Sequence, residues 1–425
     1  MTKAILKSYF NNADFPNETQ FSELIDAIPG RIGFLVAAAD APTISKEAAD
    51  YICDGTDDNI QIQAALDALP AVGGIVYLSP GTFTKGNIAI NIAAGKQLKG
   101  SSRSGTIVAG TVGNTAGMFT LGDATYLGTM TIMIPVACTN HAISGHPFLC
   151  TIEDLTITGG TSATKYAIYL YAFGDVVIKN INMSISCNGM GFEQTFGWGC
   201  GGLIVELIDI VLNSNNRVAY DIFSLVAGGY VNFCQFNYIT CAGAGGIGAG
   251  CIGLRIRNSQ YMTFIHPCLE TLDTSIYIEG QIAPGTHSAQ HNTFIGPWCG
   301  GAVVIKPFAF NTVFIGGILF GTVTDTETTL NRTTEYYGTS GAVDGGGWIG
   351  KITATANGGA ATPVADGGII SHGLQITPTW VIVSGSVAGE ICTVSGLAAD
   401  HFHVDIKKHD GTPGTAQTIY WRAEV

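Results

Sequence analysis

Short runs of Val, Ile, Phe, Tyr and Thr, separated by Gly, Asn and Asp, fill the chain from about Ala48 to Phe320. Hardly any helical periodicity is present after Leu69. Runs of β-branched and aromatic residues bounded by turn residues are typical of β-strands. We therefore expect an all-β chain, and its 57 glycines fit repeated tight corners.

A loose internal repeat indicates that these strands are stacked as coils. The segments NFCQF, TFIHP, TFIGP and VFIGG place Phe233, Phe264, Phe294 and Phe314 at intervals of 31, 30 and 20 residues. Intervals of this size correspond to one coil of a solenoid. The repeat predicts a parallel β-helix in which like residues lie over like.

The segment at residues 49–108 is expected to close the first coil. It begins ADYICDGTDDNIQIQAALDALP, in which Asp54-Gly55 predicts a turn and Asp57 or Asp58 is expected to cap a helix. The apolar residues of that helix, which would cover the open coil end, are Ile60, Ala64, Ala65, Leu66 and Leu69. Capping accounts for these acidic residues without a catalytic or calcium-binding role.

The same segment resembles the N-terminal signature of the pectate-lyase-like superfamily, which includes phage tailspikes. The motifs ISHGL, TPTWV and IYWRAEV near the C-terminus are similar to small β-modules of phage tail fibres and spikes. The opening ILKSYF looks like the start of phage tail and baseplate-associated proteins. These resemblances imply a right-handed single-stranded β-helix, a homotrimer and a place on the virion, outside the cell.

Changes of pattern divide the chain into four expected parts. Residues 1–47 form a helical attachment segment, through which a baseplate or tail protein would be bound, and residues 48–325 form the β-helix with its capping helix. Residues 326–350 form a Gly-rich linker. Residues 351–425 form a β-sandwich, which the resemblance implies is a trimerisation module.

Composition excludes several classes of function. The formal net charge of −13, with no compensating run of Lys or Arg, disfavours nucleic acid as a partner. No apolar stretch is long enough to span a membrane, and the N-terminus lacks the apolar core of a signal peptide. We therefore expect assembly in the host cytoplasm. The 11 cysteines show no CxxC pair and are predicted to be buried thiols, so neither metal nor cofactor is expected.

Carboxylates near the predicted strand edges are the candidates for catalysis. The expected catalytic residues are Glu270, which is the best single candidate, with Asp273, Glu206, Asp209 and Glu193. Glycosidases use two carboxylates about 5 to 10 Å apart, and neighbouring coils can supply that separation. A polyuronate lyase is disfavoured, because it needs a basic residue and usually a carboxylate cluster for calcium. The alternative is that these are ordinary solvated acids.

Two other sets of residues are candidates for ligand binding. Phe196 and Trp198 lie among glycines and would offer flat apolar faces to sugar rings, although burial against a neighbouring chain explains them equally well. Arg255 and Arg257 are two apart on a predicted strand, so they share a face that can hold an anionic sugar. A role in surface solubility remains the alternative for these arginines.

The sequence therefore predicts a tail spike or fibre that binds host cell-surface polysaccharide. Hydrolysis of that polysaccharide stays open, and a purely structural filament or surface-assembly subunit is the alternative. His401 and His403 share one side of a predicted strand. A trimer can gather such residues around a metal, but a partly buried strand explains them and no metal site is predicted.

Overall fold

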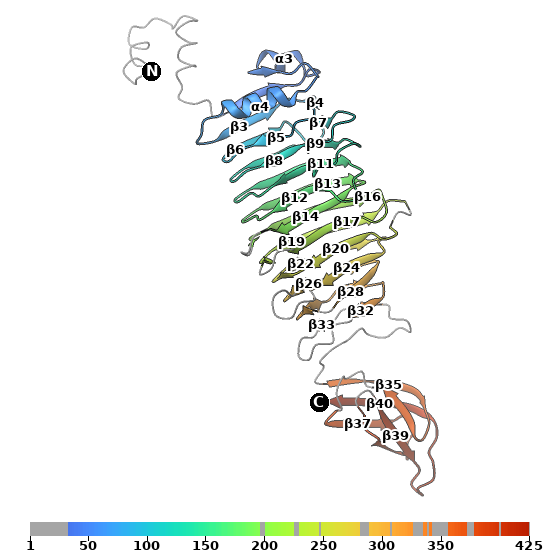
Figure 1. Cartoon of the computed structure of the whole chain (residues 1–425). Helices are drawn as coiled ribbons and strands as arrows, with labels where there is room; N and C mark the ends of the chain where they lie inside the picture. The colour runs from blue at the N-terminus through green and yellow to red at the C-terminus, as the bar shows by residue number, and fades with distance from the viewer. Residues whose placement is uncertain are drawn as a thin grey trace, which may run out of the picture.

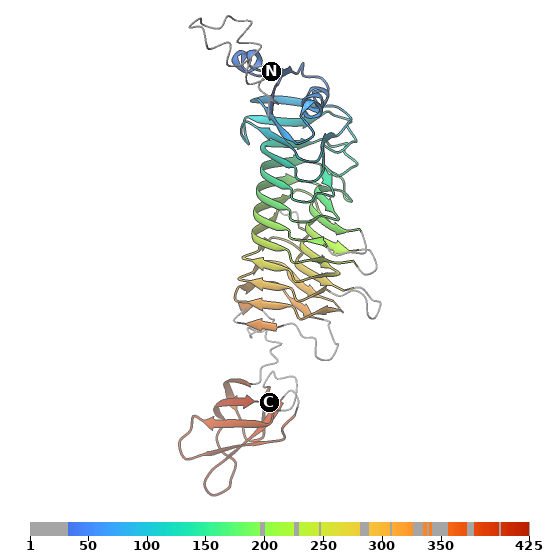
Figure 2. The ribbon, with the colours of Figure 1, turned by 90° about the vertical axis from the view of Figure 1, so that its left-hand side faces the viewer.

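The computed structural model describes residues 33–195, 200–224, 229–245, 248–280, 289–306, 308–325, 335–337, 340–341, 356–371, 378–398 and 401–424. Within these residues, three parallel sheets precede two small antiparallel sheets. Figures 1 and 2 show the parallel strands as successive rungs of one stack. The chain is a right-handed parallel β-helix, so the predicted fold class is confirmed.

The three parallel sheets are named A, B and C. Sheet A contains β1 (Gly33–Ala37), β2 (Tyr51–Ile52), β3 (Gly74–Leu78), β4 (Gly81–Lys85), β6 (Lys96–Gly100), β7 (Thr106–Gly110), β9 (Tyr126–Ile134), β11 (Thr151–Gly159), β13 (Val177–Ile185), β16 (Ile204–Leu212), β19 (Gln235–Gly243), β22 (Thr263–Ile265), β23 (Cys268–Glu270), β26 (Thr293–Ile295), β27 (Trp298–Cys299), β30 (Val313–Ile315), β31 (Ile318–Leu319), β33 (Glu335–Tyr337) and β34 (Ser340–Gly341). Sheet B contains β5 (Ile90–Ile92), β8 (Phe119–Leu121), β10 (Ile143–Gly145), β12 (Tyr166–Tyr171), β14 (Asn188–Gln194), β17 (Val218–Ser224), β20 (Ile252–Arg257), β24 (Thr274–Glu279), β28 (Ala302–Ile305) and β32 (Val323–Asp325). Sheet C contains β15 (Cys200–Gly201), β18 (Val231–Asn232), β21 (Ser259–Gln260), β25 (Ala289–Gln290) and β29 (Ala309–Phe310).

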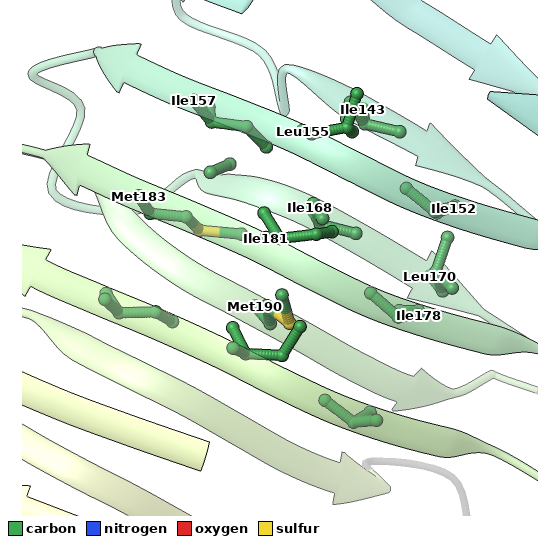
Figure 3. Packing of buried hydrophobic residues seen from close by; sticks show 14 of the residues in the cluster. Ile143, Ile152, Leu155, Ile157, Ile168, Leu170, Ile178, Ile181, Met183 and Met190 are labelled. Atoms are coloured by element: carbon green, nitrogen blue, oxygen red, sulfur yellow. The ribbon is translucent and has the colours of Figure 1, made fainter. Parts of the chain in front are cut away.

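The space between the sheets is filled by one continuous apolar core. In β11 the inward-facing Ile152, Leu155 and Ile157 are buried, whereas in β17 every residue is buried. Figure 3 shows Ile152, Leu155 and Ile157 of β11 above Ile178 and Ile181 of β13, together with residues of β10, β12 and β14. Like residues therefore stack on like, which spreads burial evenly along the coils.

Four phenylalanines form a ladder inside the last coils. Phe236, Phe264, Phe294 and Phe314 are fully buried and in register, and the stacked ring centroids are 4.7–4.9 Å apart. The prediction that Phe233 is the first member of this ladder is wrong. Phe233 is 66% exposed and instead stacks on Tyr261, which stacks on His291.

The conformation of the corner between sheets C and A explains this difference. Phe233, Tyr261 and His291 occupy equivalent corners, with φ values of 51°, 56° and 55°. The left-handed residue at each corner interrupts the alternation of inward and outward side chains, and its own side chain points outward. The phenylalanine that points into the core lies three residues after this corner residue. Such values of φ are uncommon outside glycine.

The helix α4 (Asn59–Ala68) lies against β1 to β5 at the first coils, as expected for a cap (Figure 1). It buries Asn59, Ile62, Ala65 and Leu66, whereas the expected contact residues Ile60 and Ala64 are exposed. Asp58 is the N-cap residue but makes no side-chain capping bond. Its buried carboxylate instead accepts the backbone N–H groups of Gly55 and Thr84, which joins the turn to β4.

Sheet A extends beyond the expected β-helix boundaries at both ends. β1 falls within residues 1–47 and pairs with β2 and β3. β33 and β34 fall within the expected linker and pair with β30 and β31. The short helix α3 (Thr43–Glu47) connects β1 to β2. The remaining expected attachment residues, 1–32, and most of the Gly-rich linker lie outside the described residues.

The C-terminal part is a β-sandwich of two antiparallel sheets. One sheet has the order β35 (Ala356–Val364), β40 (Gln417–Glu424), β37 (Trp380–Gly385), and the other has the order β36 (Gly368–Ser371), β39 (His401–Lys407), β38 (Ile391–Ser395). Their shared core contains Val364, Ile370, Phe402, Val404, Ile406 and Ile419.

All 11 cysteines are free thiols, and nine of them are buried, as predicted. Burial raises the pKa of Cys53 to about 12, which makes this thiol unreactive at neutral pH. In the described part of the chain, no helix has both the length and the apolar character needed to cross a bilayer.

Candidate functional site

The outer face of sheet B carries a group of polar and aromatic side chains that lie in register. β12, β14, β17, β20 and β24 are consecutive rungs of this sheet. In one outward row, Tyr169, Gly191, Asp221, Arg255 and Tyr277 are in register. Tyr171, Glu193, Phe223, Arg257 and Glu279 form the parallel row two residues further along each strand.

Asp221 is the centre of this group. It lies between the core residues Tyr220 and Ile222 of β17, so its side chain points outward. The residue is nevertheless fully buried, because neighbouring side chains cover it. A buried carboxylate needs hydrogen-bond donors and a counter-charge to remain ionised.

Two arginines and one tyrosine supply those donors. Arg255 donates from Nε and Nη2 to the two carboxylate oxygens of Asp221, at 2.9 and 2.5 Å. Nη2 of Arg257 donates to the same oxygens at 3.3 and 3.1 Å. The hydroxyl of Tyr166 donates to Oδ2 at 2.5 Å. Burial and the negative charge of Asp221 raise the pKa of Tyr166, so this phenol stays protonated.

Tyr166 reaches Asp221 across a glycine. Gly191 lies in register between Tyr169 and Asp221 on the intervening strand. A Cβ atom at Gly191 would lie 3.0 Å from ring atoms of both Tyr166 and Tyr169. Glycine at this position therefore leaves the space through which the Tyr166 ring passes.

The imidazole ring of His141 stacks on the two tyrosines of β12, Tyr166 and Tyr169. The His141 ring is parallel to that of Tyr169, with ring centroids 3.9 Å apart, and its Nδ1 accepts the backbone N–H of Tyr166 at 3.1 Å. Burial, and to a lesser extent the charge of Lys165, lowers the pKa of His141 to about 4. The imidazole is therefore neutral at pH 7.

Glu193 and Arg257 lie at the other edge of the group. The guanidinium carbon of Arg257 lies 4.6 Å from the ring centroid of Phe223, a cation–π distance. Burial raises the pKa of Glu193, against the lowering effect of Arg257 and with a further rise from Asp221. We call Tyr166, Tyr169, Glu193, Asp221, Arg255 and Arg257 the sheet B site.

Three predicted site residues, Glu193, Arg255 and Arg257, come together in the sheet B site. Glu206 and Asp209 lie on β16, on the outer face of sheet A. There Glu206 is in register between Lys179 and Asn237, and Asp209 accepts a hydrogen bond of 2.5 Å from Thr240. Their catalytic role stays a prediction, and they do not meet Glu193.

Glu270 and Asp273 also lie away from the sheet B site. Glu270 ends β23 of sheet A, where Oε1 accepts the thiol of Cys268 at 3.3 Å. Asp273 is exposed just before β24, and its carboxylate accepts the backbone N–H of Gly250 at 3.2 Å. Glu270 thus lies on sheet A and Glu193 on sheet B, and the catalytic role of Glu270 and Asp273 stays a prediction.

Phe196 and Trp198, the predicted sugar-stacking residues, lie outside the described residues. His401 and His403 share one side of β39, with ring centroids 5.4 Å apart. In the part of the chain that the structure describes, no three His, Cys, Asp or Glu side chains are grouped to hold a metal ion.

Sequence reasoning missed Asp221, Tyr166, Tyr169 and His141. Asp221 is the one charge in the strand VAYDIFS, and an acid between core residues is a signal that could have identified it. The aromatic residues gave the weaker signal YAIYLY, which reads equally well as an ordinary strand.

Comparison with known proteins finds similarity in solved structures alone. No family model matches the chain, and no curated protein matches its sequence. The tailspike protein gp49 of Pseudomonas phage LKA1 is 12% identical, with a TM-score of 0.48, over 86% of this chain and 92% of gp49. ORF18 of Geobacillus virus E2 is 14% identical, with a TM-score of 0.48, over 85% of this chain and 76% of ORF18.

A third similar structure is the A-module of the mannuronan C-5 epimerase AlgE6 of Azotobacter vinelandii. It is 14% identical, with a TM-score of 0.40, over 68% of this chain and 96% of the module. The solved structures similar to this chain thus include a phage tailspike and a module of a mannuronan C-5 epimerase. The β-helical fold of this chain rests on its own strand pairings.

Proposed function

We propose that this protein is a tail-spike-like protein that binds cell-surface polysaccharide through the sheet B site. The observation that carries this proposal is the gathering of two partly exposed arginines and the buried Tyr166 around buried Asp221, with the half-buried Tyr169 in the same outward row. Aromatic side chains offer apolar surface to sugar rings, and fixed donors orient the hydroxyl groups. The network around Asp221 holds these donors in place before a ligand arrives.

Binding is a better match to this site than hydrolysis. Burial raises the pKa of Glu193, which is the direction that a general acid needs. Its neighbouring carboxylate, Asp221, is however fully buried and accepts bonds from two arginines and a tyrosine. A carboxylate held in this way is a poor base or nucleophile, because its lone pairs are already engaged. We therefore place glycan binding above depolymerase activity.

The proposal extends to the assembly. The protein would be a homotrimer on a virion, attached to a baseplate or tail protein by its N-terminal segment, with the C-terminal β-sandwich aiding trimerisation. Similarity of the sequence ends to phage tail proteins supports this arrangement. Analytical ultracentrifugation of the full chain would test it, and a monomer at micromolar concentration would contradict it.

The test of binding compares variants of two sheets on an array of purified bacterial capsules and O-antigens. Tyr169→Ala is expected to weaken retention at least tenfold, because it removes a half-buried aromatic ring from the same outward row as Asp221 and Arg255. The control Tyr77→Ala removes a tyrosine that is 46% exposed on sheet A, and it should bind as the unmodified chain does. Glu206→Gln and Glu270→Gln should also bind normally.

Loss of retention in the sheet A variants, with none in Tyr169→Ala, would contradict the sheet B location. Release of reducing ends that stops in Glu193→Gln would favour the depolymerase. Absence of binding to every glycan would leave the structural filament as the function.

A further inference from the structure

We propose that the sheet B site takes an acidic sugar, whose anionic group is bound by Arg257 with help from Arg255. This inference deepens the proposed function and rests on it, because it names the class of saccharide that the same site would select. The shared chemistry is an oxyanion on a sugar ring, and the favoured source is the carboxylate of a uronic acid.

The first argument is the balance of charge at the site. Two guanidinium groups contact a single carboxylate, that of Asp221, and the third donor, Tyr166, is a neutral phenol. The described residues show no ion pair between Glu193 and either arginine. At contact distance, two guanidinium groups therefore share one carboxylate, although the chain as a whole carries −13. A partly buried positive charge without a counter-charge favours an anionic ligand.

Glu279 is the other acid that could neutralise Arg257. The two residues are in register on neighbouring strands, yet the described residues show no ion pair between them. After burial, the charge of Glu279 contributes to the raised pKa of Tyr277. Among the described residues, Arg257 therefore pairs with Asp221 alone, and it shares that carboxylate with Arg255.

The second argument is an unused donor. Nε of Arg257 is buried and has no hydrogen-bond partner among the described residues. A buried donor without an acceptor costs about 1–3 kcal/mol, and protein sites keep such donors where a ligand or water supplies the acceptor. The Arg257 side chain as a whole is 25% exposed, so its outer edge is open to solvent.

The third argument is the fixed orientation of the guanidinium groups. Arg255 is held by two bonds to Asp221, and Arg257 by bonds from Nη2 and by the ring of Phe223. A guanidinium whose plane is fixed binds a carboxylate through two parallel bonds with little loss of side-chain entropy. Tyr171 lies in register beside Glu193 and supplies apolar surface for the sugar ring.

The test measures binding of the full chain to polygalacturonate, alginate and hyaluronate, each paired with its carboxyl-reduced form. The acidic polymers should bind at least tenfold more tightly than their neutral counterparts, and affinity should fall with added salt. Arg257→Gln should lower affinity for the acidic polymers about 10- to 100-fold, which is the range of a charge-assisted hydrogen bond. Arg257→Lys should recover part of the lost affinity, because lysine restores the positive charge but lacks the paired N–H donors of the guanidinium.

Arg103→Gln is the matched control, since Arg103 donates to the Asn180 backbone on sheet A, and it should bind normally. Circular dichroism and the unfolding midpoint would establish that each variant is folded. Dextran sulfate provides the second arm, and tighter binding to it than to the polyuronates would assign the oxyanion to sulfate esters.

Equal binding of acidic and carboxyl-reduced polymers, or normal binding by folded Arg257→Gln, would overturn the inference. Binding confined to neutral bacterial glycans would overturn it too, while leaving the proposed function intact. Failure to bind any polysaccharide would overturn both.

Discussion

The hydroxyl of Tyr166 donates a hydrogen bond of 2.5 Å to the carboxylate of Asp221, which lies 55 residues further along the chain. Tyr166 belongs to β12 and Asp221 to β17, and β14 lies between these two strands. The contact therefore spans two steps of the β-helix. It ties the proposed binding surface to the stacking of coils, so errors in coil register would destroy the sheet B site.

Asp221→Asn is predicted to destabilise the protein by about 3–5 kcal/mol. The substitution removes the buried counter-charge of two arginines and leaves their donors poorly satisfied. Urea unfolding followed by circular dichroism measures this change. Asp209→Asn is the control, because that exposed carboxylate accepts one bond from Thr240 and should contribute less than about 1 kcal/mol. Equal losses in the two variants would contradict the central role of Asp221.

Gly191→Ala is predicted to abolish glycan retention while the fold remains. The added methyl group would lie 3.0 Å from the rings of Tyr166 and Tyr169, so both rings must move. Overpacking of this kind costs about 1–3 kcal/mol. Gly300→Ala is the control, because the atoms nearest to its Cβ lie at 3.4 Å or more. Normal retention by Gly191→Ala would show that the position of Tyr166 is unimportant.

The sequence predicted part of the sheet B site and missed its centre. Arg255 and Arg257 were found because their spacing along one strand places them on one face, a purely local property. Asp221 contacts residues 34, 36 and 55 positions away. Coil lengths vary, since Val205 pairs with Phe236 after 31 residues and Phe236 with Phe264 after 28. Without the register, sequence distance cannot say which outward residues meet.

The fold was predictable for a different reason. Repeated apolar runs show directly which segments are buried strands, so the fold can be predicted from them. They do not show which residue of each run points inward, because the conformation of the corner decides that. Phe233 and Phe236 are both apolar, and the left-handed φ of 51° at Phe233 puts it outside. The same limit applies to the helix α4, where the buried residue is Ile62 and not Ile60.

The phenylalanine ladder gives a quantitative test of this assignment. Phe294→Ala is predicted to cost about 3–5 kcal/mol, because the ring is fully buried between Phe264 and Phe314. Phe233→Ala should cost less than about 1 kcal/mol, because it removes an exposed ring. Chemical unfolding of both variants measures the difference. Similar costs would contradict the inward register of Phe294.

Protonation of His141 is predicted to destabilise the folded chain in mild acid. The folded pKa is about 4, while an unfolded histidine titrates near 6.5. Between these values the unfolded state binds the proton and the folded state does not, so this contribution to stability falls as the pH falls from about 6.5 to 4. Above pH 6.5 the contribution is fully present.

The contribution of His141 must be separated from that of acidic groups whose effect on stability changes with pH in the opposite direction. Glu193 and Asp58 have raised pKa values, so they favour the folded state at low pH and lose that contribution as the pH rises. Urea unfolding at a series of pH values should therefore compare the unmodified chain with His141→Gln, whose amide oxygen can still accept the Tyr166 N–H. The stability advantage of the histidine should shrink towards pH 4. In Lys165→Gln the histidine pKa should rise, which narrows the window, and an unchanged NMR titration of His141 would contradict the assigned cause.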